Sequence, residues 1–469
     1  MTQTCNKCIS IWQKMIGGKF MVGRMICTKG KTTLSTRANL EDNMKSLHTS
    51  VMAAAVAAAV ATPALATELT IAIVNNGHMI NMQKVADAYT ADTGVKLNWV
   101  SLEEGVLREQ VTSDTATSGG QYDIINIGMQ EAPIWGEAGW IEPLNFGASY
   151  DMDDMLPAIR NGLSHNGTLY AAPFYGESSM VMYRKDLTDA AGVSIADNDS
   201  WDNIKKVAAA IHNPDKGVYG ACLRGKPGWG DNMAFITTVV NSFGGAWFDK
   251  DMKPTIDSDE WKAAINFYVD LLGNYGPPGS EGNSFNEILA LYNEGKCGMW
   301  IDATIAASFL KVDGVAYAQS PNAGNPVGAN WLWAWAMAVP AGSPNAEESK
   351  KFIEWATSKD YIKAVAAHPD FGWGSVPTGT RSSTYAYPEF KAVAGFAAAE
   401  MAAIKSAAPE ATDLKPYVGV QFAAIPEFPE VGIAVAQEMA AALSGAKSVN
   451  DALAASQAAA AAIMSEAGY

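Results

Sequence analysis

The chain has 469 residues, of which 48% are hydrophobic and 17% are charged, with 42 Gly and 21 Pro spread along its length. This composition and the 14 Trp residues are typical of a globular protein and exclude a disordered chain, a coiled coil and a collagen-like fibre. The net charge of -16 argues against a nucleic-acid-binding protein, because binding to phosphates needs clustered Lys and Arg side chains.

The segment 44–66 has the three parts of a secretory signal peptide. A short basic start leads into the apolar run 51–60, and Ala64 and Ala66 form the small-x-small ending that a signal peptidase recognises. A membrane anchor is the alternative, but the apolar run is shorter than the ~20 residues that span a bilayer. We therefore expect cleavage after Ala66 and a periplasmic mature protein.

Residues 1–43 precede this signal and match no part of it. An export signal rarely lies behind a long segment of mixed composition, so we interpret 1–43 as a spurious extension from an upstream start codon. Cys5, Cys8 and Cys27 lie in it. Without a second Cys pair or a nearby His they do not predict a metal site.

Strands and helices alternate directly after the signal. The pattern predicts a strand over 68–74, a helix over 82–93, a strand over 95–100, a helix over 107–118 and a strand over 122–127. Strand, helix and strand at this spacing form a βαβ unit. We therefore expect a largely parallel sheet with helices on both faces.

The alternation continues towards the C-terminus. Further strands and helices are predicted over 179–183, 201–212, 261–275, 297–301 and 345–357, and an Ala-rich helical tail, broken near Gly445, over 431–468. A single core rarely grows past ~250 to 300 residues. The mature chain should therefore divide into two α/β lobes.

Polar and aromatic residues recur in loops next to the predicted strands, where ligands bind in open α/β sheets. These loops carry amides, carboxylates and indoles at 75–78, 128–135, 173–177, 228–232, 302–304, 330–335 and 371–374. Carboxylates and amides bond to hydroxyl groups, and an indole face covers the apolar C–H surface between them. The loops thus predict a neutral polyhydroxylated ligand. No Walker-type phosphate cradle is present, and no cofactor is expected.

Trp331, Trp333 and Trp335 alternate along one of these stretches. If the stretch is a strand, the three indoles share one face. The sequence does not decide which of them faces a ligand.

Templates for catalysis are missing from the sequence. It has no His-Glu-x-x-His or Gly-x-Ser-x-Gly motif and only five His. An exported glycoside hydrolase remains an alternative, because two of Glu131, Glu177 and Asp302 could act as acid and nucleophile. We expect a binding protein rather than an enzyme.

The two Cys residues of the predicted mature chain are Cys222 and Cys297. An exported protein in an oxidising compartment makes a disulfide between them plausible. Two buried free thiols remain the alternative, because a disulfide requires a close approach that the sequence does not show.

Several short stretches, each weak alone, together carry a resemblance to a known family. They are 69–77 (LTIAIVNNG), 121–125 (QYDII), 170–174 (YAAPF), 183–187 (YRKDL), 243–245 (FGG), 295–300 (GKCGMW) and 343–345 (SPN). In this order they resemble family 1 extracellular solute-binding proteins of ABC importers, over essentially all of 67–469. Similarity to the sorbitol/mannitol-binding branch rests on 74–77 (VNNG), 97–104 (LNWVSLEE), 134–136 (IWG), 222–230 (CLRGKPGWG) and 299–304 (MWIDAT).

This resemblance implies a type II periplasmic binding protein-like fold, with two α/β lobes around a ligand cleft joined by hinge strands. We expect lobe 1 to comprise 67–176 and 335–388, and lobe 2 to comprise 177–334 and 389–469. It also implies that the protein captures a linear sugar alcohol by lobe closure and delivers it to the permease subunits of an ABC transporter. We expect a monomer. A mono- or oligosaccharide ligand remains the alternative.

The loops and the resemblance together predict the ligand-binding residues. By analogy with sugar binders, the first-strand loop, the loop after Asp123, the lobe crossover and the far-lobe rim each contribute. The expected set is Asn76, His78, Gln130, Glu131, Trp135, Tyr175, Glu177, Trp229, Asn232, Asp302, Trp331, Trp333 and Trp373. For His78 a solvated loop histidine is the alternative.

Overall fold

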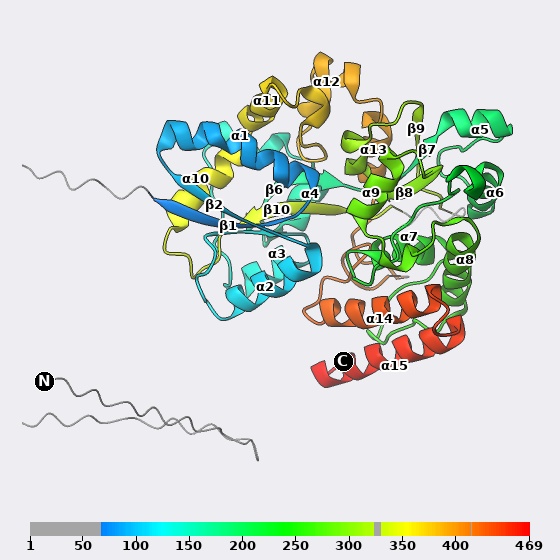
Figure 1. The fold of residues 1–469 in the computed structure, drawn as a ribbon. Coiled ribbons are helices and arrows are strands. Elements are labelled where there is room, and N and C mark those ends of the chain that lie inside the picture. The colour runs from blue at the N-terminus through cyan, green and yellow to red at the C-terminus, as the bar shows by residue number, and fades with distance from the viewer. Residues whose placement is uncertain (1–66, 323–329, 414) are drawn as a thin grey trace, which may run out of the picture. The chain divides into compact units, whose positions relative to one another are not determined.

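The computed structural model describes residues 67–322, 330–413 and 415–469, which belong to one compact unit (Figure 1). The predicted signal peptide at 44–66 and the extension at 1–43 lie outside the described residues. Among the residues described, no helix is both long and apolar enough to cross a membrane.

A five-stranded sheet has the strand order β2-β1-β3-β10-β6. β1 (Glu68–Val74) pairs in parallel with β2 (Lys96–Leu102) and β3 (Ile124–Ile127), which confirms the predicted parallel start. β10 (Trp333–Ala338) runs antiparallel between β3 and β6 (Ala172–Glu177). Every residue of β3, β6 and β10 is buried, as expected where helices cover both faces of a sheet.

The helix after β1 begins earlier than predicted. α1 (Gly77–Thr93) starts directly after Asn76, whose side chain accepts a hydrogen bond from the N–H of Met79 and caps the helix. The helix ends at Gly94, which has a left-handed φ of 75°. Because only two residues separate strand from helix, the Asn76 side chain is held at the carboxyl end of the sheet.

Helices cover both faces of this sheet. Figure 1 shows α1 and α10 (Ala346–Ala356) on one side and α2 (Glu104–Ala116) and α3 (Glu131–Glu137) on the other. Smaller elements complete this part: α4 (Pro157–Gly162), β4 (Ser164–His165), β5 (Thr168–Leu169), α11 (Lys359–Ala367) and α12 (Pro388–Val393).

A second sheet of three strands has the order β8-β7-β9. β7 (Ser179–Arg184) is antiparallel to both neighbours, β8 (Met299–Ala303) and β9 (Val315–Gln319). The expectation of a largely parallel sheet is therefore wrong for this part. No crossover helix precedes β7, because it follows β6 with only Ser178 between them. Its two neighbours in the second sheet, β8 and β9, both run in the opposite direction.

The remaining helices lie on the side of the molecule that holds the second sheet (Figure 1). They are α5 (Lys185–Ala191), α6 (Trp201–Ile211), α7 (Asn232–Ser242), α8 (Asp259–Tyr275), α9 (Phe285–Asn293), α13 (Ala397–Ser406), α14 (Phe428–Leu443) and α15 (Val449–Ala467). The predicted helical tail is confirmed: α14 and α15 lie side by side (Figure 1), and Ser448 caps α15 by accepting from the N–H of Asp451 at 3.1 Å.

A disulfide joins Cys222 to Cys297, whose Cα atoms are 5.8 Å apart. Both residues are fully buried. The segment with Cys222 runs beside β8, where Cys222 pairs with Trp300 in an isolated bridge. The disulfide thus fastens the chain just before Arg224 to the segment just before β8, the strand that carries Asp302.

Candidate ligand-binding site

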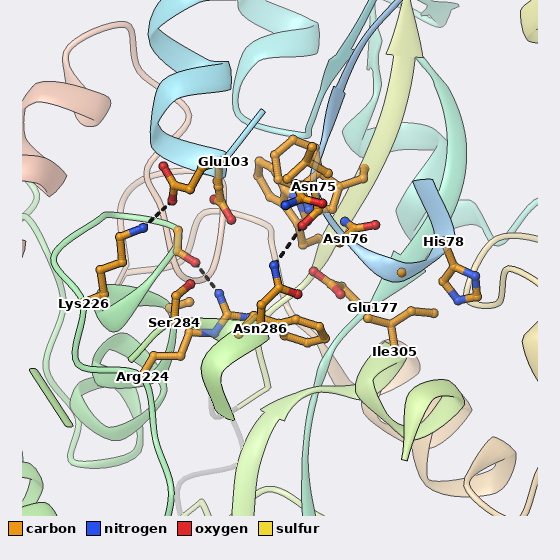
Figure 2. A pocket seen from close by; sticks show the side chains of 18 of the residues that line it. Asn75, Asn76, His78, Glu103, Glu177, Arg224, Lys226, Ser284, Asn286 and Ile305 are labelled. Atoms are coloured by element: carbon orange, nitrogen blue, oxygen red, sulfur yellow. Dashed lines mark hydrogen bonds and ion pairs between the residues drawn. The ribbon is translucent and has the colours of Figure 1, made fainter. Parts of the chain in front are cut away.

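A pocket of about 930 Å³, part of it open to solvent, lies where elements of the two sheets meet. One wall comes from the ends of β1, β2, β6 and β10, and the other from the loop before α7, the start of α9 and the segment after β8 (Figure 2). Residues far apart in the sequence therefore face one pocket.

The Asn76 cap is also part of the pocket wall. Its Nδ2 donates a hydrogen bond of 2.6 Å to the hydroxyl of Tyr175 on β6. The neighbouring Asn75 carbonyl accepts 2.9 Å from Nδ2 of Asn286, which belongs to α9 on the opposite wall. These bonds hold the first-strand loop in place and tie it across the pocket (Figure 2).

Arg224 and Asp302 form a buried, bidentate ion pair at the pocket wall, which Arg224 lines and Asp302 does not. Arg224 Nε lies 2.8 Å from Asp302 Oδ2, and Nη2 lies 2.6 Å from Oδ1. Trp300 Nε1 donates to the same carboxylate at 2.8 Å. Such charge-assisted parallel bonds fix a guanidinium in one orientation. The Asp302 carboxylate is thereby committed to Arg224 and Trp300, while Arg224 lines the pocket.

A second ion pair spans the mouth of the pocket. Lys226 Nζ lies 2.6 Å from Glu103 Oε1 (Figure 2). Burial alone raises the pKa of Glu103, but the hydrogen bond and the charge of Lys226, together with the backbone N–H groups of Val106 and Gly105, outweigh burial and lower the pKa of this carboxyl. Both groups therefore stay charged, and their opposite charges compensate each other.

Arg108 on α2 is the third cation of the wall. Its guanidinium forms ion pairs with Glu104, at 2.9 Å, and with Glu131. The same group lies 3.9 Å from the ring centroid of Trp229, stacked on an indole of the opposite wall. All three wall cations, Arg108, Arg224 and Lys226, are thus neutralised by carboxylates.

Glu177, at the end of β6, behaves differently from these acids. It is buried on the pocket wall, and burial raises its pKa to about 8, although Arg224 lowers it. Asp302, Glu104 and Glu400 raise it further. At neutral pH this carboxyl is therefore mostly protonated, and it can both donate a hydrogen bond to a hydroxyl group and accept one.

Two buried ring nitrogens of wall residues have no hydrogen-bond partner among the described residues. They are Nε2 of His78 and Nε1 of Trp331. Burial lowers the pKa of His78 to about 3, so the imidazole is neutral. A buried polar atom without a partner is costly. A ligand hydroxyl group within hydrogen-bond distance of either nitrogen would remove that cost.

Seven predicted ligand residues line the pocket, namely Asn76, His78, Tyr175, Glu177, Trp229, Trp331 and Trp333. Trp335 lies on the wall too, so all three alternating indoles face it. Six predicted residues do not line this pocket: Gln130, Glu131, Trp135, Asn232, Asp302 and Trp373. Direct ligand contact by these six stays a prediction.

The six residues away from the wall have other partners. Glu131 and Asp302 hold pocket-lining arginines, as described above. Gln130 Nε2 donates to the carbonyl of Ile425 at 3.0 Å, and Asn232 Nδ2 donates to that of Ala436 at 3.0 Å. The ring of Trp135 lies 5.9 Å from that of Trp140, and the ring of Trp373 lies 4.7 Å from that of Tyr387.

The charged residues of the wall were missed as ligand candidates. They include Glu103, Glu104, Arg108, Arg224 and Lys226. Four of them stand in the stretches 97–104 and 222–230, whose similarity to the polyol-binding branch was a usable signal. No signal in the sequence marked Arg108 as a ligand candidate, because it lies in a predicted helix where a charged residue is typical of the solvent-exposed face.

The acids proposed for a hydrolase are not assembled around the pocket. Of Glu131, Glu177 and Asp302, only Glu177 lines it. The other two are paired with Arg108 and Arg224. The described residues also contain no group of three His, Cys, Asp or Glu side chains that could hold a metal ion.

Comparison with known proteins agrees with this binding geometry. Residues 76–363 match the family described as bacterial extracellular solute-binding protein. The chain is 45% identical to the mannitol-binding protein of Pseudomonas aeruginosa over 437 residues, which cover 90% of this chain and 100% of that protein.

Two solved structures show the same fold. A solute-binding protein of an ABC transporter from Agrobacterium vitis S4, with bound D-mannitol, is 51% identical with a TM-score of 0.84, covering 86% of this chain and 100% of that one. One from Agrobacterium radiobacter K84, in complex with ribitol, has a TM-score of 0.75 at 23% identity, covering 85% of this chain and 98% of that one. The fold is thus periplasmic binding protein-like, and the chain belongs to the bacterial extracellular solute-binding protein family, as a binding protein rather than an enzyme.

Proposed function

We propose that this protein binds a linear sugar alcohol of the mannitol and sorbitol class and delivers it to an ABC importer. The observation that carries the proposal is the compensated charge of the pocket: Arg108, Arg224 and Lys226 each pair with a carboxylate. A phosphate or carboxylate ligand needs cations that are not already neutralised. A neutral ligand does not.

The polar groups of the wall suit a ligand rich in hydroxyls. The imidazole Nε2 of His78 and the indole Nε1 of Trp331 have no hydrogen-bond partner among the described residues, and the protonated carboxyl of Glu177 lines the same pocket. Each can bond to a hydroxyl group, which both donates and accepts. The mannitol bound in the structure from Agrobacterium vitis and the mannitol-binding relative support the same ligand class.

Uptake would proceed by closure of two lobes around the ligand. We assign 67–176 and 335–388 to one lobe and 177–334 and 389–469 to the other, with the passage from β6 to β7 as one hinge. The ligand bonds to both walls in the closed form and to one in the open form, and this difference shifts the population towards closure.

The partners and the compartment follow from the same role. We propose that residues 44–66 direct export, that cleavage occurs near Ala66, and that the monomeric mature protein works in the periplasm. There the closed form would dock on the permease subunits in the inner membrane.

Isothermal titration calorimetry of the chain 67–469 tests the proposal. D-mannitol, D-sorbitol and D-arabitol should bind saturably at one site, with a dissociation constant of order 1 μM, or about -8 kcal/mol. D-glucose, D-mannose and maltose are the comparison ligands. Binding confined to these sugars would assign the protein to mono- or oligosaccharides, and turnover of a glycoside would overturn the binding function altogether.

A further inference from the structure

Arg108 occupies a cage of three indoles. Its guanidinium carbon lies 3.9 Å from the ring centroid of Trp229, 4.7 Å from that of Trp335 and 5.0 Å from that of Trp333. Each of these indoles is only 4% exposed. Trp229 comes from the loop before α7 and the other two from β10, so the guanidinium is in contact with residues of both walls.

Carboxylates hold the guanidinium in this cage from its edge. Glu104 Oε1 accepts from Nε at 3.1 Å and from Nη2 at 2.9 Å, and Glu131 accepts from Nη1. A guanidinium bonds through its edge and stacks through its face, so the two interactions do not compete. Cation–π contacts are stronger where water is excluded from them.

Two glycines make room for this arrangement. A Cβ on Gly230 would lie 2.0 Å from Glu104 Oε1, and a Cβ on Gly128 would lie 1.9 Å from Cζ2 of Trp333. Any side chain at either position would displace the carboxylate or the indole. The cage is therefore built by four separate segments of the chain.

An occupied cage changes what the tryptophans can do for a ligand. Indole faces bind pyranose sugars by covering the apolar C–H face of the ring, but here a guanidinium covers the same faces. Arg108 has five N–H groups, of which three are used by the carboxylates. The remaining two belong to a side chain of the pocket wall.

We propose that Arg108 is a specificity-determining residue that favours an acyclic polyol over a pyranose ring. Its guanidinium covers the faces of Trp229, Trp333 and Trp335, so a pyranose ring cannot stack on them. Its free N–H groups can instead donate hydrogen bonds to hydroxyl oxygens. The inference rests on the proposed function, since it explains why a tryptophan-rich pocket would prefer a linear ligand.

The test compares D-mannitol with methyl α-D-mannopyranoside by calorimetry, in the wild type and in R108K and R108M. R108K keeps the charge near Glu104 and Glu131 but loses the planar group, and R108M loses both. The ratio of the two dissociation constants, mannoside over mannitol, should fall at least about tenfold in both variants, which corresponds to 1.4 kcal/mol. If the wild type binds the mannoside too weakly to give a dissociation constant, a lower limit on the wild-type ratio is enough, because the ratio is expected to decrease in the variants.

The readout separates specificity from general damage, because a loosened fold weakens both ligands together and leaves their ratio unchanged. E131Q removes one of the two carboxylate charges that pair with Arg108, and it should lower the ratio by a smaller factor. If R108M does not fold, E131Q takes its place in the test. R184K, at an ion pair with Asp186 outside the pocket, is the matched control and should change nothing.

Two outcomes would overturn the inference in different ways. A wild type that binds mannitol, with a ratio preserved within threefold in R108K and E131Q, would remove the role of Arg108 and leave the polyol function intact. A wild type that binds no alditol would remove the proposed function itself.

Discussion

The guanidinium of Arg224 holds the carboxylate of Asp302 by two hydrogen bonds of 2.8 Å and 2.6 Å, and the Asp302 side chain is fully buried. Arg224 lines the pocket, whereas Asp302 does not. An acid expected to bind ligand directly thus acts on the pocket wall through an arginine. Because the pair is buried, we expect the fold to lose stability when one partner is removed.

Asp302→Ala should destabilise the fold by roughly 3–5 kcal/mol, because it leaves the buried Arg224 without its counter-charge. Urea unfolding of the ligand-free chain measures this change. The control is Asp186→Ala at the exposed pair with Arg184, where the loss should be about 0–1 kcal/mol. Equal losses in the two variants would show that the buried pair contributes no more than a surface pair.

Mass spectrometry of the unreduced chain 67–469 should find no alkylatable thiol, because Cys222 and Cys297 are its only cysteines and are bonded to each other. The double variant C222S/C297S should be less stable by about 2–4 kcal/mol, since the unfolded chain gains freedom without the cross-link. Two labelled thiols in the native protein would contradict this pairing.

Glu177 should make both stability and ligand binding depend on pH. Burial raises its pKa from 4.5 to about 8. Between these two values the native carboxyl keeps its proton while the unfolded one has lost it, so the stability contributed by the protonated form falls as pH rises. Arg224, Asp302, Glu104 and Glu400 are the charged groups that act on it.

The neutral variant Glu177→Gln separates this carboxyl from the other groups. Its stability relative to the wild type should improve steadily as pH rises from 4.5 to 8, and its mannitol affinity should lack the decline that the wild type shows as pH passes through about 8. Parallel pH profiles for the two proteins would show that Glu177 is already ionised at neutral pH.

His78 should not titrate in the physiological range. Burial lowers its pKa from 6.5 to about 3, so the native ring stays neutral while the unfolded one takes up a proton below 6.5, and the fold loses stability as pH falls through this window. In NMR spectra the His78 ring signals should stay constant between pH 5 and 8 and shift when mannitol binds. A midpoint near 6.5 would indicate the solvated loop histidine instead.

Much of the local structure follows from short-range patterns. The strand at 68–74, the helical tail and the alternating indoles could be predicted because side-chain periodicity acts between near neighbours. The start of α1 at Gly77 was missed for a related reason. The sequence Asn75–Asn76–Gly77 suits a turn and a cap equally well, and the hydrogen bond from Met79 to Asn76 decides between them.

The sequence by itself determined the α/β class, the family and a polar, tryptophan-rich pocket for a neutral ligand, because motifs and composition carry that information along the chain. Only the tertiary structure decided which groups meet. Arg108 and Trp229 are far apart in sequence, as are Arg224 and Asp302, and charge neutralisation depends on distances of a few ångströms. The pocket-lining cations are compensated because these pairs form, and no pattern along the chain records such pairing.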